Sequence, residues 1–134
     1  MTVVVVGAGP VGVTAAVLLA RRGVDVLVLD RHAGVHPQPR AVHLDDECLR
    51  VLQAAGVADA FAAISAPMAG LRLVDAAGRT LAEFPRGAGP NGWPEGSMFT
   101  QPDLERLLRS ALAAQPTARL RGGVELLHLS LIHI

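Results

Sequence analysis

The chain has 134 residues, of which 51% are hydrophobic and 18% are charged, and its formal net charge is zero. This composition is typical of a single globular domain and excludes an intrinsically disordered chain. The neutral balance gives no electrostatic attraction to nucleic acid or to an anionic membrane, so we expect neither as a partner.

The chain has a single cysteine, Cys48, which excludes an intrachain disulfide and the paired-cysteine zinc and redox motifs. A single cysteine is typical of proteins in a reducing compartment, and we expect a cytoplasmic protein. The uncharged run from Val3 to Ala20 has the length of a membrane span or a signal peptide. Three glycines and a proline interrupt its centre, and no basic segment precedes it. We therefore expect neither a span nor a signal.

The first thirty residues predict a strand, a helix and a second strand. The four valines Val3–Val6 are typical of a strand buried on both faces of a parallel sheet. Gly23 is placed to cap the helix, and Val24–Leu29 form the second strand, which ends at Asp30. Together they predict a right-handed βαβ unit. The helix is predicted from apolar residues at helical spacing, namely Val13, Ala16, Val17 and Ala20.

After a loop over 31–40, the spacing predicts a helix from Leu44 to Ala55, ended by Gly56. Asp45, Asp46 and Glu47 fall in its first turn, where the helix dipole favours negative charge. Asp46 is also placed to pair with Arg50 one turn later. The predicted apolar face consists of Leu44, Cys48, Val51, Leu52 and Ala55.

The rest of the chain predicts a short helix over 58–64 and a hairpin of strands 71–75 and 80–84. Residues 85–96 form a loop, because seven of the twelve are Gly or Pro. Trp93 in this loop either covers an active site or packs on the surface. A strand over 118–127 is predicted as the third of the parallel sheet. Before it comes a helix that starts at Pro102 and carries Leu104, Leu107, Leu108, Ala111 and Leu112 on its apolar stripe.

A glycine motif lies between the first strand and the first helix. Gly7, Gly9 and Gly12 form G-x-G-x-x-G, with Pro10 and Val11 inside it. The first glycine permits the tight turn, the second lets a pyrophosphate approach the backbone, and the third lets helix and strand pack closely. The free N–H groups at the helix start then point at the phosphate. The alternative is a tight turn that binds nothing.

An acid at the end of the second strand completes this pattern. Asp30 lies eighteen residues after Gly12 and is followed by Arg31. Its carboxylate can accept hydrogen bonds from ribose hydroxyls and would repel a 2′-phosphate. We predict that Asp30 and Arg31 join the glycine loop in binding a dinucleotide.

The motif extends beyond its glycines. Ala16 lies four residues after Gly12, and Gly23 lies seven residues after Ala16. This longer pattern resembles the FAD-binding start of the glutathione-reductase-type flavoproteins. On the glycines alone, a nicotinamide-dependent dehydrogenase domain stays an alternative.

Two further stretches are more selective. "PRAVHLDDECLRVLQAAGV" (39–57) and "GWPEGSMFTQPDLERLLR" (92–109) resemble the flavin-dependent aromatic hydroxylases of the para-hydroxybenzoate hydroxylase type. Among these hydroxylases, the chain most resembles the branch that includes 3-(3-hydroxyphenyl)propanoate hydroxylase. The resemblance covers residues 3 to about 127.

This resemblance implies that the cofactor is FAD and adds two site residues. Arg40 matches the arginine that contacts the cofactor's phosphate and ribityl region, and a guanidinium can hold phosphate oxygens bidentately. Gln101 matches the glutamine that meets the ribityl chain, where an amide can both donate and accept. The alternatives are a surface arginine at position 40 and a helix-capping or solvent-facing residue at position 101.

The resemblance also implies a reaction, in which NADH or NADPH reduces the flavin and O2 then hydroxylates a small phenolic acid. Family members are several times longer and carry later Asp-Gly and Gly-Asp segments that are absent here. We therefore predict an incomplete α/β, Rossmann-like FAD-binding domain. Residues 1–128 would be its N-terminal part, with the catalytic residues outside them, and this piece would fold poorly and be inactive alone. A complete, non-catalytic nucleotide-binding module is the alternative.

Two minor features remain. "LSLIHI" (129–134) is similar to the translation of a sequencing-adapter end, and we expect a non-native tail, with a short terminal strand as the alternative. His32, His36 and His43 have the spacing of no standard metal site, so no metal is predicted.

Overall fold

The computed structural model describes residues 1–130, which form two compact units. Unit 1 contains residues 1–39 and the chain from residue 101 onward, and unit 2 contains residues 40–100. Most of the predicted adapter-derived tail lies outside the described residues, at 131–134, and stays a prediction. In residues 1–130 no helix is both long and apolar enough to span a membrane.

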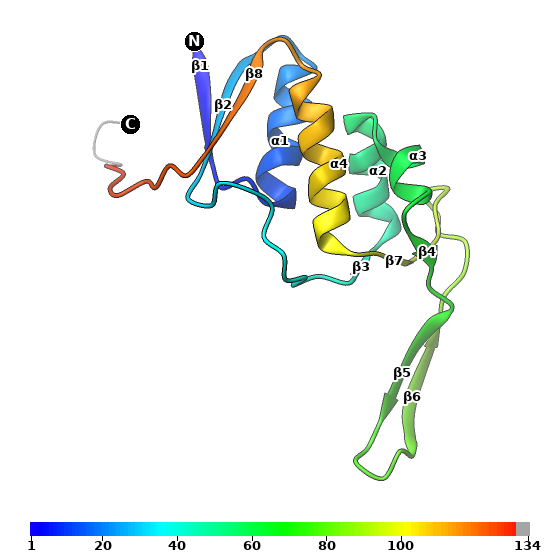
Figure 1. Ribbon diagram of the computed structural model, residues 1–134. Helices are drawn as coiled ribbons and strands as arrows, with labels where there is room; N and C mark the ends of the chain where they lie inside the picture. The colour runs from blue at the N-terminus through cyan, green and yellow to red at the C-terminus, as the bar shows by residue number, and fades with distance from the viewer. Residues whose placement is uncertain (131–134) are drawn as a thin grey trace. The chain divides into compact units, whose positions relative to one another are not determined.

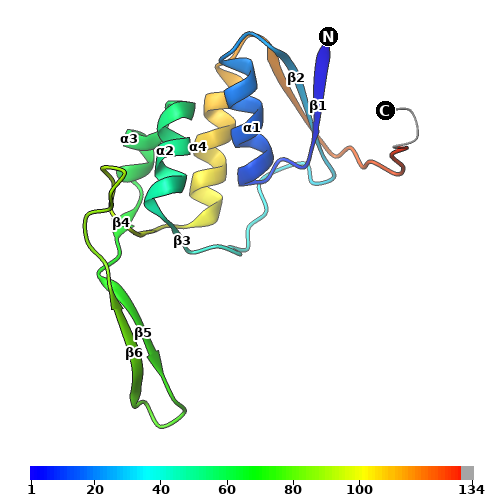
Figure 2. The ribbon, with the colours of Figure 1, turned by 180° about the vertical axis from the view of Figure 1, so that it is seen from behind.

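Unit 1 is a parallel sheet with two helices. Strands β1 (Thr2–Val6), β2 (Asp25–Asp30) and β8 (Ala118–Gly122) are ordered β1-β2-β8, and both pairs are parallel. Helices α1 (Pro10–Ala20) and α4 (Gln101–Ala113) run side by side in both ribbon views (Figures 1 and 2). The predicted βαβ start and the third parallel strand are confirmed.

The two faces of this sheet differ. Val26 and Val28 alternate toward the helices and are buried with the helix side chains Val13 and Val17. On the opposite face, Val4 and Val6 of β1 are 53% and 55% exposed. The prediction that β1 is buried on both faces is therefore wrong for the described residues. β1 is an edge strand, and only one of its faces has helices to cover it.

Helix α1 has the predicted buried stripe, since Val13, Ala16, Val17 and Ala20 are at most 6% exposed. Its end is closed as predicted by Gly23, which has a φ of +77°. The Gly23 N–H donates to the Ala20 carbonyl at 2.9 Å, and the Val24 N–H donates to the Leu19 carbonyl at 3.2 Å. This paired arrangement is the Schellman motif, which glycine adopts without steric cost.

Helix α4 begins at Gln101, so Pro102 is its second residue and not its first. Leu104, Leu108 and Leu112 are buried at i, i+4, i+8 spacing, as the apolar stripe predicts. Strand β8 ends at Gly122, five residues before the predicted end at residue 127. The cause is Gly123, whose φ of +73° is incompatible with a continuing strand.

Unit 2 contains helices α2 (Asp46–Ala55) and α3 (Ala58–Ala62) and two small antiparallel sheets. One sheet has the order β3-β7-β4, with strands His43–Leu44, Ser97–Met98 and Ala66–Pro67. The other is the predicted hairpin of β5 (Gly70–Val74) and β6 (Thr80–Pro85).

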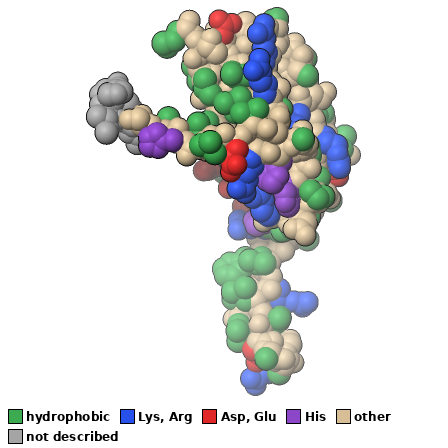
Figure 3. All heavy atoms as spheres, turned by 60° about the vertical axis from the view of Figure 1, so that its left-hand side comes forward, with side chains coloured by type: hydrophobic (Ala, Val, Ile, Leu, Met, Phe, Trp, Pro, Cys, Tyr) green, Lys and Arg blue, Asp and Glu red, His purple; other side chains and the backbone are tan. Residues whose placement is uncertain are grey.

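The small core of unit 2 centres on Phe61, which is fully buried and meets the Phe99 ring edge-to-face at 5.6 Å. The hairpin, by contrast, displays apolar side chains to solvent (Figure 3). Leu71, Leu81 and Phe84 are 51%, 69% and 46% exposed.

The apolar face of α2 differs from the predicted one. Leu49, Leu52 and Ala55 are buried, whereas Cys48 and Val51 are exposed. Apolar residues occupy so much of this helix that two neighbouring stripes satisfy the 3.6-residue period. The two stripes share Leu52 and Ala55, and the one that adds Leu49 is the buried one. Leu44 lies before the helix, in strand β3.

The acidic start of α2 has two roles. Asp45 is the N-cap, and its Oδ1 accepts from the Cys48 N–H at 2.8 Å. Asp46 does not pair with Arg50 in the described chain. Its Oδ2 accepts from the backbone N–H and side-chain Nδ2 of Asn91, at 3.1 and 2.9 Å. Two hydrogen bonds inside a partly buried site outweigh one exposed ion pair.

The Gly/Pro-rich loop is present as predicted, and these bonds from Asn91 fix its tip to α2. Trp93 of the same loop lies partly buried, and its indole Nε1 donates to the Gln53 Oε1 at 3.4 Å. Within unit 2, Trp93 therefore packs against α2, which is the second of the two roles considered for it.

The Asp45 cap predicts a pH-dependent stability difference. Asp45→Ala should lower the free energy of unfolding by about 1 kcal/mol at neutral pH, and Asp45→Asn should lose much less because asparagine also caps helices. The Cys48 N–H holds the pKa of Asp45 below its ordinary value. The ionic share of this stabilisation is thus present above the unfolded-state pKa and is lost as pH falls through the folded-state pKa. Urea unfolding of the three proteins at neutral and acidic pH measures this, and equal stability of wild type and Asp45→Ala would contradict the cap.

Candidate nucleotide-binding site

The glycine loop lies at the carboxyl end of the parallel sheet, between β1 and α1. The Gly7 N–H donates to the Leu29 carbonyl at 2.7 Å, which ties the loop to the end of β2. Gly7 has a φ of +101°, a conformation that side-chain-bearing residues rarely adopt. The chain can therefore turn sharply here from strand to helix, as the motif predicts.

Gly12 and Gly9 are needed for different reasons. A Cβ on Gly12 would lie 2.0 Å from the Gly7 carbonyl oxygen, so helix and loop can pack this closely only with glycine at position 12. A Cβ on Gly9 would meet no atom within 4 Å. The protein itself thus tolerates a side chain at position 9, and the open space there is available to a ligand.

The start of α1 presents backbone donors to this space. Gly9 is the N-cap and has no side-chain cap, and α1 has no acidic residue in its first turn. Val11 and Gly12 lie in that turn, where an α-helix supplies no acceptor for backbone N–H groups. Pro10 occupies the first helical position and has no N–H. The helix dipole and these N–H groups favour an anion at this end.

Asp30 ends β2 beside the loop and is held by two backbone donors. Its Oδ2 accepts from the Ala8 N–H at 2.6 Å, and its Oδ1 accepts from the His32 N–H at 2.7 Å. Partial burial of the carboxyl raises its pKa, but these two bonds, with the charges of His32 and Arg109, outweigh burial and place the pKa below its ordinary value. Asp30 is therefore ionised at neutral pH, and each carboxylate oxygen has a second lone pair for a ribose hydroxyl.

The other predicted contacts are placed differently. Arg31 is exposed, and its Nε donates to the His32 Nε2 at 3.3 Å. Arg40 is exposed and belongs to unit 2. Gln101, the first residue of α4 in unit 1, is 4% exposed, and its Nε2 donates to the Glu105 Oε1 at 2.8 Å. The structure brings together the glycine loop and Asp30, while the cofactor contacts of Arg31, Arg40 and Gln101 stay predictions.

Sequence reasoning missed two polar residues of α4. Glu105 is 2% exposed and accepts from Gln101. Arg109 donates from Nη2 to the Ala8 carbonyl at 3.1 Å. With Gln101 they form a polar row at i, i+4 and i+8, beside the buried leucine row of the same helix. That row was readable in the sequence, because three polar residues at this spacing share one face.

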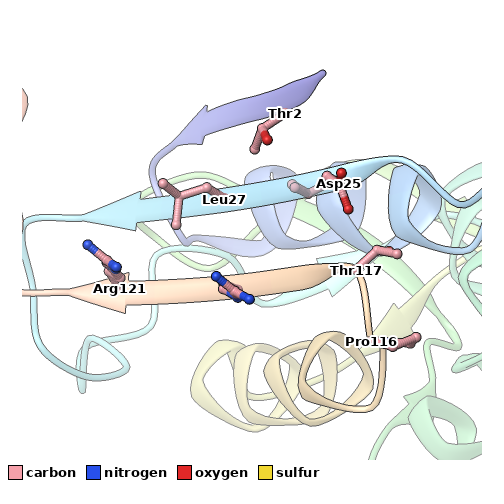
Figure 4. A pocket seen from close by; sticks show the side chains of 8 residues that line it. Thr2, Asp25, Leu27, Pro116, Thr117 and Arg121 are labelled. Carbon is pink, nitrogen blue, oxygen red and sulfur yellow. The ribbon is translucent and has the colours of Figure 1, made fainter.

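A pocket of about 310 Å³ lies elsewhere on unit 1 (Figure 4). It is lined by Thr2, Asp25 and Leu27 from the first two strands and by Thr117, Arg119 and Arg121 around β8. Thr2 and Asp25 start their strands, whereas the glycine loop follows the strand ends. In parallel α/β sheets ligands bind at the carboxyl ends, so we assign the site to the glycine loop. In residues 1–130 no three His, Cys, Asp or Glu side chains gather as a metal site would require.

A family model described as an FAD binding domain matches residues 1–130. The 3-(3-hydroxy-phenyl)propionate/3-hydroxycinnamic acid hydroxylase 2 of Burkholderia vietnamiensis is 41% identical over 128 residues, covering 96% of this chain and 23% of that protein. The corresponding hydroxylase of Mycobacterium sp. (strain JLS) is 40% identical over 121 residues, covering 90% of this chain and 21% of that protein.

Solved structures agree with these relatives. The p-nitrophenol 4-monooxygenase PnpA of Pseudomonas putida superposes with a TM-score of 0.81 at 26% identity, over 91% of this chain and 32% of that one. The flavin-dependent monooxygenase PieE, solved with FAD and substrate, gives 0.75 at 30% identity, over 92% and 24%. The chain spans about a quarter of the length of the curated relatives it matches.

The two glycines predict opposite outcomes when each is replaced by alanine. Gly12→Ala should lower the free energy of unfolding by at least about 1–3 kcal/mol, because its Cβ overlaps the Gly7 carbonyl oxygen and α1 must move away. Gly9→Ala should leave stability within about 1 kcal/mol of wild type, since its Cβ enters open space. Thermal and urea unfolding of both variants measure this contrast. Equal losses in the two would show that the close approach at Gly12 is not what the helix packing depends on.

Proposed function

Because the chain belongs to the FAD binding domain family, we propose that unit 1 binds the ADP part of FAD at the glycine loop. The observation that carries this proposal is the open space at Gly9 in front of the α1 N-terminus, with the Asp30 carboxylate beside it. The donors match a pyrophosphate, and the carboxylate matches a ribose diol. The residues therefore fit this half of the cofactor.

Each predicted residue has a proposed role toward FAD. The N–H groups of Gly9, Val11 and Gly12 hold the pyrophosphate, Gly7 and Pro10 shape the turn, and Asp30 accepts from the ribose. Arg31 contributes positive charge at the rim of this site. Arg40 contacts phosphate and ribityl oxygens, since a guanidinium suits both. Gln101 meets the ribityl chain through its amide, which Glu105 holds at 2.8 Å.

For the complete gene product we propose a flavin-dependent monooxygenase. The relatives carry the name 3-(3-hydroxy-phenyl)propionate/3-hydroxycinnamic acid hydroxylase, and their identity of about 40% extends over nearly all of this chain. The substrate would be a similar phenolic acid, with NADH or NADPH and O2. When bound, FAD supplies the redox chemistry, and the residues of this chain bind and orient it. The catalytic residues would lie outside residues 1–128, so that segment alone would be inactive.

Two alternatives are less well supported. A nicotinamide-dependent dehydrogenase domain shares the glycines, but the family model that matches residues 1–130 is that of an FAD binding domain. A non-catalytic nucleotide-binding module would have the same loop, but relatives about 40% identical to this chain carry the names of hydroxylases. We also propose a cytoplasmic location, because the single cysteine is a free, exposed thiol.

Replacement of Asp30 tests the site. In the complete gene product, Asp30→Ala should weaken FAD binding by roughly 10- to 100-fold, the effect of losing hydrogen bonds to a charged group. Asp25→Ala is the matched control, because Asp25 begins the same strand at its opposite end and is exposed. It should bind FAD as wild type does. Quenching of flavin fluorescence on titration measures both affinities.

The outcome of this titration separates the proposals. Wild-type protein that binds no FAD, or that prefers NAD, would sink the flavin proposal. Equal FAD affinity of wild type and Asp30→Ala would remove Asp30 from the site while leaving the family assignment intact.

A further inference from the structure

Ala8, the residue between the first two glycines of the motif, is held at both of its polar groups. Ala8 is fully buried. Its N–H donates to the Asp30 Oδ2 at 2.6 Å, and its carbonyl accepts from the Arg109 Nη2 at 3.1 Å. Arg109 comes from α4, 101 residues further along the chain. The loop is therefore fixed from two sides, by the end of β2 and by a separate helix.

The contact with Arg109 determines where the Gly9 N–H points. The Ala8 carbonyl and the Gly9 N–H belong to the same peptide unit, which is planar and trans. In a trans peptide the C=O and N–H bonds point in opposite directions. Because Arg109 draws the carbonyl toward α4, the Gly9 N–H points away from Arg109. The positive charge of the guanidinium beside the carbonyl oxygen also polarises the peptide, which strengthens the Gly9 N–H as a hydrogen-bond donor.

The Gly9 N–H matters more in this chain because Pro10 follows it. Pro10 is the first residue of α1 and has no N–H to offer an anion. The donors at the helix start are thus those of Gly9, Val11 and Gly12. Gly9 is the first of them and lies outside the helix, so the geometry of α1 does not by itself fix its peptide.

The surroundings of Arg109 indicate that its contact with the Ala8 carbonyl is the reason for an arginine at this position. Its Nε is buried and has no hydrogen-bond partner within the described residues. Burying a guanidinium N–H without a partner is unfavourable, and an apolar side chain on this helix face would avoid that cost. The same guanidinium lowers the pKa of Asp30 by its charge. Arg109 thus acts on both groups that flank the proposed nucleotide site.

We propose that Arg109 is a positioning residue for the anion site: through the Ala8 carbonyl it aims the Gly9 N–H at the pyrophosphate. The inference rests on the proposed function of the loop. It concerns a residue that touches the loop and not the cofactor. Its effect should therefore grow with the number of phosphates on the ligand.

A series of three ligands and three variants tests this inference. The complete gene product is freed of flavin, and adenosine, AMP and ADP are titrated by calorimetry into wild type, Arg109→Met, Arg109→Lys and Arg106→Met. Arg109→Met should weaken ADP binding about 10-fold, AMP binding less and adenosine binding hardly at all. Arg109→Lys keeps a cationic donor and should recover part of the ADP affinity. Arg106, on the exposed side of α4 and paired with Asp103, is the matched control and should change nothing.

Each contrary result has its own meaning. Equal weakening of adenosine and ADP by Arg109→Met would show a structural role only, and an unchanged ADP affinity would overturn the inference outright. If Arg109→Met does not fold, Arg109→Lys decides through the same ligand series, and a uniform effect on all three ligands counts against positioning. If wild type binds FAD and ADP and Arg109→Met binds both with the same affinities, this inference alone is wrong. Wild-type protein that binds neither ligand sinks the proposed function.

Discussion

The close approach of helix α1 to the end of strand β1 is the constraint on which the rest of unit 1 depends. With no side chain at Gly12, the helix start can lie against the Gly7 carbonyl at the carboxyl end of the sheet. The loop that leads into α1 is held against β2 by the bond from the Ala8 N–H to Asp30. The same loop leaves the space at Gly9 open. One missing Cβ thus permits the packing, and another provides room for a ligand.

Helix α4 adds to this arrangement in two ways. Its leucine row is buried, and α4 packs beside α1 and against β8, so the two helices together cover one face of the sheet. In its polar row, Arg109 donates to the Ala8 carbonyl and Glu105 accepts from Gln101. The same helix therefore contributes apolar packing and fixes polar groups near the loop. Nonpolar burial makes the larger contribution to stability, and the hydrogen bonds determine orientation.

Much of unit 1 could be predicted because its signals are local. The glycine spacing, the α1 stripe and the Asp30 strand end each depend on a few neighbouring residues, and all are confirmed as structure. Predictions failed where burial or a hydrogen-bond partner depends on residues far apart in the sequence. Burial of β1 depends on what covers each face of the sheet, and the α2 stripe was ambiguous by period alone. Asp46 binds Asn91, 45 residues away, in place of Arg50.

The candidate site shows the same division. The loop and Asp30 were predictable from spacing, whereas Arg109 reaches Ala8 across 101 residues, a pairing that no short motif encodes. Its polar row was visible in the sequence, but its partner was not. Arg40 and Gln101 were assigned from family resemblance and Arg31 from its place directly after Asp30, and their contacts with the cofactor stay predictions.

A crystal structure of the complete gene product with FAD tests the central claim most directly. We expect the pyrophosphate at the N-terminus of α1, within hydrogen-bond distance of the Gly9 N–H, and the ribose hydroxyls on the Asp30 carboxylate. The Arg109 guanidinium should remain on the Ala8 carbonyl and make no contact with phosphate. A pyrophosphate bound away from the glycine loop, or a ribose that does not contact Asp30, would contradict the account.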